Sequence, residues 1–183
     1  MTTPPLSTVV AGPSAVWVKR VASQIDASAG DLVSIDRADT LATAADLAVG
    51  RSAAVIVSIV DPAVEGFDPD DFADLRGRLA TIGTRVVAVT RSISLGGLEP
   101  LLSHSTVDAI LTDPWSPDGF DKVLCAQLAT FVVGHRRDLV PVVGDYFTDD
   151  DFRRAELRLE RRQAAPVHDV DRPHPLLDTS TED

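Results

Sequence analysis

The sequence contains a single cysteine, Cys125, so the chain cannot form an internal disulfide and gives no sign of an oxidising compartment. No stretch reaches the ~18 consecutive apolar residues of a membrane span. A secretory leader has a basic segment followed by an apolar block, and the amino terminus of this chain lacks that pattern. We therefore expect a soluble, cytoplasmic protein without membrane contact, in which Cys125 is a small core residue.

Positive charge is scarce as well. The chain has 17 Lys and Arg residues against 28 Asp and Glu residues, which gives a net charge of -11. A chain of this charge repels nucleic-acid phosphates and anionic lipids. We expect no nucleic-acid binding by the main domain, although the arginines near residue 155 are a local exception.

The usual signatures of cofactors and catalysis are missing. The turn at residues 11–15, Ala-Gly-Pro-Ser-Ala, is neither a dinucleotide fingerprint nor a phosphate-binding loop. No Ser-His-Asp order, pair of catalytic carboxylates or Cys-His constellation stands out. The sequence thus predicts no catalytic residues, no cofactor and no metal, and therefore no enzyme.

The apolar patterning predicts an α/β domain. Short apolar runs predict strands at residues 7–11, 32–35, 53–60, 85–90 and 107–111, and each is followed by a helical pattern. Strands that alternate with helices, without hairpin signals, imply one parallel sheet covered on both faces. The commonest arrangement at this size is flavodoxin-like, with five parallel strands in the order 2-1-3-4-5.

Two segments depart from a regular pattern. The expected helix at residues 94–104 contains Gly96, Gly97 and Pro100, so it should be short, bent or mobile. Residues 138–147 are an irregular apolar connector, and a further helix begins at Thr148 or Asp149. We expect a main domain at residues 1–137, a connector and C-terminal helix at 138–165, and a disordered tail at 166–183.

Residues 107–123 concentrate the features of a functional edge. An apolar strand ends at Asp113-Pro114, and Ser116 can cap a helix whose first residue is Pro117. Because functional loops of α/β folds follow the carboxyl ends of the strands, Asp113 lies where chemistry is expected.

The order and spacing of these residues resemble the receiver domains of two-component response regulators, over about residues 6–137. In that family, strand three ends in a phosphate-accepting aspartate, followed by a proline and a glycine, and strand four ends in Thr or Ser. Those positions here hold Ser58, Pro62, Gly66 and Thr90. Strand five of a receiver ends in lysine and proline, where this chain has Asp113-Pro114-Trp115.

The departures from the family concern every charged group of its site. Acidic residues that hold magnesium in receivers are replaced by Ala11, Gly12 and Pro13. Ser58 replaces the accepting aspartate, Asp113 replaces the lysine, and Ile110 replaces the aromatic residue that often reports phosphorylation. The resemblance therefore implies a pseudo-receiver, with a vestigial pocket at Ala11, Gly12, Ser58, Thr90 and Asp113.

Several alternatives stay open at this point. Asp61 could be a displaced phosphate acceptor, although an aspartate before Pro62 is typical of a turn. Ser58 and Thr90 could bind a small anion, and Asp113 could pair with Arg91. Metal binding could involve Asp68, Asp70, Asp71 and Asp74, which helix capping also explains, or His168 and His174, whose spacing is a weak signal.

The resemblance implies a non-enzymatic regulatory or adaptor protein that works by protein-protein contact. Receivers usually communicate through helix four, strand five and helix five, which here carry Leu98, Leu101, Leu102, Trp115 and Phe120. The C-terminal helix, with Phe152 and Leu159, could dock onto a partner, onto a second copy or onto its own domain. Alternatives are a phosphorylation-dependent regulator that uses Asp61 and a small-ligand-binding flavodoxin-like domain.

Overall fold

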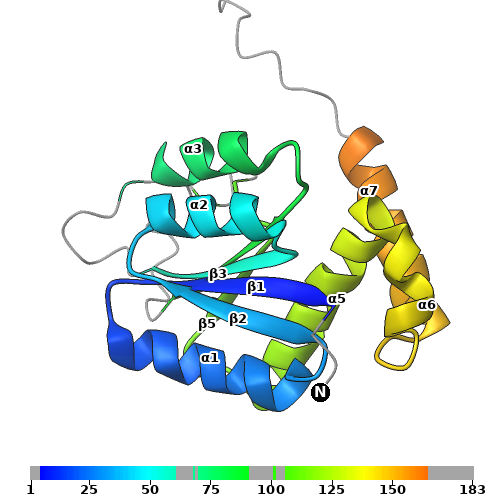
Figure 1. Ribbon diagram of the computed structural model, residues 1–183, viewed down its shortest axis with the longest axis horizontal. Helices are drawn as coiled ribbons and strands as arrows, with labels where there is room; N and C mark the ends of the chain where they lie inside the picture. Colours follow the sequence, from blue (N-terminus) through cyan, green and yellow to red (C-terminus); the bar gives the residue numbers. More distant parts are fainter. Residues whose placement is uncertain (1–4, 61–67, 69, 91–100, 102–105, 165–183) are drawn as a thin grey trace, which may run out of the picture.

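A computed structural model of the chain describes residues 5–60, 68, 70–90, 101 and 106–164. Its centre is a parallel sheet in the order β2-β1-β3-β4-β5, which confirms the predicted topology (Figure 1). The strands are β1 (Leu6–Ala11), β2 (Val33–Ala38), β3 (Val55–Val60), β4 (Arg85–Thr90) and β5 (Ala109–Thr112). Every residue of β3 is buried, as an apolar central strand requires.

Helices cover both faces of the sheet. One face carries α1 (Ala15–Ala29) and α5 (Pro117–His135), and the other carries α2 (Leu41–Arg51) and α3 (Asp70–Leu79) (Figure 1). The buried side chains divide accordingly into two apolar clusters, one on each face. The helix predicted at residues 94–104 lies outside the described residues except for Leu101, which is buried.

Local capping explains where several helices begin. The hydroxyl of Thr40 accepts a hydrogen bond from the backbone of Thr43 at 3.1 Å, and Ser116 accepts one from Gly119 at 3.0 Å. Asp68 accepts a bond from the backbone of Asp70 at 2.9 Å, as its predicted capping role requires. Ser14 precedes α1 without any side-chain capping bond.

The C-terminal extension packs on the same domain. A single 3-10 turn, η1 (Arg137–Leu139), and the short α6 (Val140–Val143) replace the irregular connector that was expected. The final helix, α7 (Asp149–Ala164), lies along α5 (Figure 1). Val143, Phe147 and Ala155 are buried in the cluster that α1 and α5 share, so the extension adds to the core.

No helix in the described part of the chain is both long and apolar enough to cross a membrane. The fifth strand begins two residues later than predicted, and Asp108, directly before it, forms buried ion pairs with Arg76 and Arg85. The carboxyl ends of the strands form the edge where the predicted site lies.

Candidate functional site

The two hydroxyl groups of the predicted vestigial pocket lie on one face of the sheet but at different depths. Ser58 pairs in register with Ala88, whereas Thr90 pairs with Val60, so Ser58 is recessed by two residues, ~6–7 Å along the strand. Ser58 and Thr90 are 2% and 0% exposed. β3 ends at Val60, as predicted, so Ser58 lies two residues before the end of the strand.

The position that would hold a metal-binding carboxylate is closed by packing. Ala11 pairs with Ser58 and is 1% exposed. A Cβ atom added to Gly12 would lie 2.9 Å from the Cβ of Ile59, closer than real Cβ contacts. An acidic side chain at this position would displace Ile59. Within the described ranges, no group of three or more His, Cys, Asp or Glu side chains could hold a metal ion.

Asp113 forms an ion pair with a residue that the sequence did not predict as its partner. Its carboxylate lies 3.1 Å from the guanidinium of Arg20 on α1, with 22% of the Asp113 side chain exposed. The backbone N–H of Asp113 donates to the carbonyl of Thr90 at 2.8 Å, which holds the end of β5 against β4. Arg91, the expected partner, lies outside the described residues. Asp113 therefore joins the edge of the sheet to α1.

Two tryptophans complete this contact. The guanidinium carbon of Arg20 lies 5.0 Å from the ring centroid of Trp17 and 4.5 Å from that of Trp115. The two rings meet edge to face at 5.9 Å. We call Trp17, Arg20, Asp113 and Trp115 the Trp-Arg patch. Both tryptophans are half-buried, so each ring packs against the protein and is also partly exposed at the surface.

Exposed groups continue the Trp-Arg patch along α1. Val16 is 77% exposed, and it lies one helical turn before Arg20, so the two share a face of the helix. Further along, Gln24 donates to Asp121 of α5 at 3.2 Å, and Ser28 also donates to it. These bonds link α1 to α5.

The residues that were predicted to form a contact surface differ in their burial. Leu101 and Phe120 are 0% and 1% exposed, which corrects their assignment to a surface: both fill the core, and Phe120 supports Trp115 at a ring distance of 5.8 Å. Phe152 and Leu159 are half-buried and pack against the core beside α5, so α7 does not present them freely. Leu98 and Leu102 lie outside the described residues, as do Asp61, His168 and His174.

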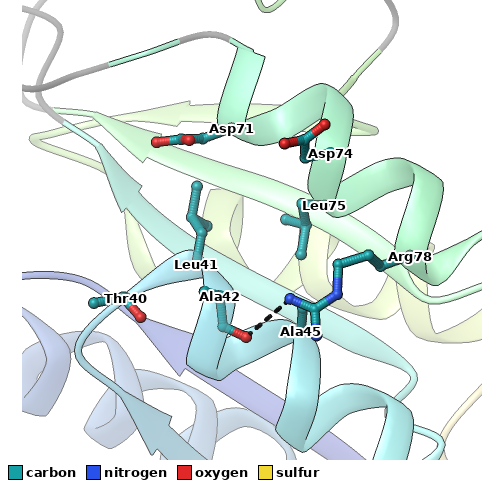
Figure 2. Close-up of a pocket in the computed structure, with 8 residues that line it drawn as sticks. All are labelled: Thr40, Leu41, Ala42, Ala45, Asp71, Asp74, Leu75 and Arg78. Carbon is teal, nitrogen blue, oxygen red and sulfur yellow. Dashed lines mark hydrogen bonds between the residues drawn. The ribbon is translucent and has the colours of Figure 1, made fainter.

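A hollow with a volume of about 410 Å³ lies between α2 and α3 (Figure 2). Leu41, Ala45 and Leu75 line it together with the carboxylates of Asp71 and Asp74. Its one arginine, Arg78, donates to the carbonyl of Ala42 at 3.3 Å and pairs with Asp46. The described lining therefore offers no matched acid and base for catalysis and no free cation for an anion.

The sequence contains one local signal for the Trp-Arg patch. Arg20 follows Trp17 by three residues, which on a helix places a cation within reach of the ring. Nothing in the sequence indicated that Trp115 would meet this pair, because the contact joins segments almost a hundred positions apart.

The sequence matches no protein-family model, and no curated protein matches it either. Solved structures do match its fold. The receiver domain of the response regulator NarL from Mycobacterium tuberculosis aligns with 69% of this chain and 98% of its own, at a TM-score of 0.56 and 18% identity.

A receiver domain of an HD domain-containing protein from Pseudomonas fluorescens gives a TM-score of 0.58 at 14% identity, over 72% of this chain and 92% of its own. A pilus assembly-related protein from Burkholderia pseudomallei gives 0.57 at 17% identity, over 68% and 90% of the two chains. At these identities the likeness concerns the fold. This chain therefore contains a receiver-like domain, built on the fold of the response-regulator receivers.

Proposed function

We propose that this protein is a non-enzymatic regulatory or adaptor protein, a pseudo-receiver that acts by protein-protein contact and not by phosphotransfer. The observation that carries the proposal is the Arg20–Asp113 ion pair of 3.1 Å. It places a committed carboxylate where the receiver resemblance requires a free lysine. A phosphoryl group beside Asp113 would meet a carboxylate already paired with Arg20, not the unpaired cation that a lysine supplies.

The acceptor side of the site supports the same reading. Ser58 is 2% exposed, and a serine hydroxyl is a weak nucleophile unless a base activates it. Ile59 packs where a side chain at position 12 would stand, so a magnesium-binding carboxylate cannot enter there without rearrangement. Magnesium requires hard oxygen ligands, and receivers use it to bind the phosphoryl group.

The Trp-Arg patch is the contact surface that we propose. Tryptophan and arginine are the residues most enriched among binding hot spots. Arg20 is held by Asp113 and by two aromatic rings, so little side-chain freedom is lost when a partner binds. Val16, at 77% exposure, adds apolar area on the same side of α1. The partner is another protein, and we expect the contact in the cytoplasm.

The first test uses the intact chain as bait in its own cell, with bound proteins quantified by mass spectrometry. Val16→Lys places a charge on the proposed surface and should abolish capture of a partner that the wild type retains. Val49→Lys is the matched control, because Val49 is 47% exposed on α2, on the other face of the sheet. A partner lost equally from both variants, or from neither, contradicts the proposed surface.

A second test addresses phosphotransfer. Incubation with acetyl phosphate and magnesium should give no phosphorylated chain by intact-mass analysis. Labelling that disappears in Asp61→Asn would instead establish the displaced-acceptor alternative. Light scattering of the purified chain decides whether the partner is a second copy: a dimer that Val16→Lys dissociates would identify it.

A further inference from the structure

A buried carboxylate at the opposite, amino edge of the sheet gathers three arginines. Asp108, just before β5, is 2% exposed in its side chain. Its oxygens lie 2.7 Å from Arg76 of α3, 2.6 Å from Arg85 of β4 and 2.5 Å from Arg162 of α7. The backbone N–H of Val86 also donates to it at 2.7 Å. The carboxylate thus ties α7 to the sheet and to α3.

This cluster carries more positive charge than its carboxylate neutralises. Three guanidinium groups against one carboxylate leave two positive charges, in a chain whose net charge is -11. Burial lowers the pKa of Arg85 to about 10, against the attraction of Asp108, and the charges of Arg162 and Arg76 act in the same direction as burial. The excess cations are therefore held close together at an energetic cost.

A cavity of about 270 Å³ opens beside these arginines. We call it the arginine cavity, and the residues that matter in its lining are Arg76, Arg85, His135, Leu159, Arg162 and Gln163. Among the described residues, no Asp or Glu lines it. The buried Nε of Arg76 has no hydrogen-bond partner in the described part of the chain.

We propose that the arginine cavity binds a small oxyanion of phosphate chemistry, either inorganic phosphate or a phosphate monoester of a small metabolite. Guanidinium groups present forked donors that match phosphate oxygens. A dianion would neutralise the two positive charges that Asp108 leaves. The cavity is somewhat smaller than the ~300–1,000 Å³ of drug-sized ligand sites, which favours an oxyanion over a dinucleotide.

The bound anion also strengthens the attachment of α7. Leu159, Arg162 and Gln163 of α7 form one wall of the cavity, and Arg76 and Arg85 form another. An anion between these walls contacts both, so its binding free energy adds to the docking of the helix. This site is distinct from the Trp-Arg patch, which lies at the carboxyl edge of the sheet.

The test is thermal unfolding of the full chain in increasing inorganic phosphate, with ionic strength held constant by sodium chloride, and isothermal titration calorimetry on the same samples. A saturable rise in Tm beyond that in chloride is expected. Arg162→Gln and Arg76→Gln should each weaken phosphate binding at least tenfold. Arg161→Gln, which removes the same charge from an exposed neighbour outside the cavity, should bind as the wild type does.

The source of the anion follows from parallel titrations with ribose 5-phosphate. Tighter binding of the ester identifies a phosphorylated metabolite, and binding of inorganic phosphate alone identifies the free ion. Equal Tm shifts in phosphate and chloride, or undiminished binding in Arg76→Gln and Arg162→Gln, would overturn the proposal. Such a failure leaves the Trp-Arg patch untouched, because Val16→Lys tests that surface separately.

Discussion

Asp108→Asn is a small substitution that should lower the free energy of unfolding strongly. It keeps the shape of the side chain but removes the charge that three arginines share. Removing one partner of a buried ion pair destabilises a protein by ~3–5 kcal/mol, because the other charge stays buried.

The exposure of each arginine decides where in that range the loss should fall. Arg85 is 11% exposed in its side chain, so it stays uncompensated, whereas Arg162 is 41% exposed and can turn to water. Arg76, at 23%, is intermediate. We therefore expect a loss of about 3 kcal/mol, at the lower end of the range for buried pairs. Out of a total stability of ~5–15 kcal/mol, this is a large fraction.

Equilibrium urea unfolding of the full chain, followed by circular dichroism at pH 7, measures this loss as a lower midpoint at unchanged slope. Asp138→Asn is the matched control, because its carboxylate pairs with Arg136 at 3.0 Å on the surface and its side chain is 63% exposed. The control should unfold at the wild-type midpoint. A wild-type midpoint for Asp108→Asn as well would refute the idea that its buried ion pairs hold α7 and the sheet together.

The difference in stability between the wild type and Asp108→Asn should depend on pH. Burial acts to raise the pKa of Asp108, but the charges of Arg85 and Arg76 outweigh it, and the pKa lies below its ordinary 3.8. A carboxylate with a lowered pKa stabilises the folded state fully above its unfolded value, near pH 4, and loses this effect as pH falls through the folded value. The stability gap between wild type and Asp108→Asn should therefore be constant from pH 5 to 7 and should narrow below pH 4. A gap that widens on acidification contradicts this assignment.

The remaining predictions concern two glycine substitutions and the reactivity of Cys125. Gly12→Ala should lower the free energy of unfolding by ~1–3 kcal/mol, because its Cβ meets Ile59 at 2.9 Å, whereas Gly50→Ala in α2, with nothing within 4 Å, should raise it by ~0.5–1 kcal/mol. Urea midpoints check both, and equal effects would show that Ile59 yields easily. Cys125 should react slowly with Ellman's reagent at pH 8 in the folded chain, because burial and then the charge of Asp121 raise the pKa of its thiol. A rate equal to that of the urea-unfolded chain would contradict this.

The elements that sequence alone located are those whose signals are local. β3 is buried along its whole length, and its apolar run predicted a central strand because both faces of a parallel sheet are covered. Ser116 caps α5 as predicted, because a hydroxyl beside the first turn can accept from a nearby backbone N–H. Alternation and crossover handedness left few strand orders, and the structure confirms the commonest of them at this size.

Local sequence signals could not predict which charged side chains pair with one another. Asp113 was recognised as a departure from the receiver pattern, yet its partner Arg20 stands on α1, far away in the sequence. Asp108 gave no local signal, since its three arginines come from α3, β4 and α7. Local periodicity specifies which face of an element is apolar, but ion pairs form only after the packed elements have brought distant side chains within ~4 Å. The sequence thus determined the sheet, its order and the positions at which the chain departs from the receiver pattern, and the tertiary packing decided which charges meet and where α7 is held.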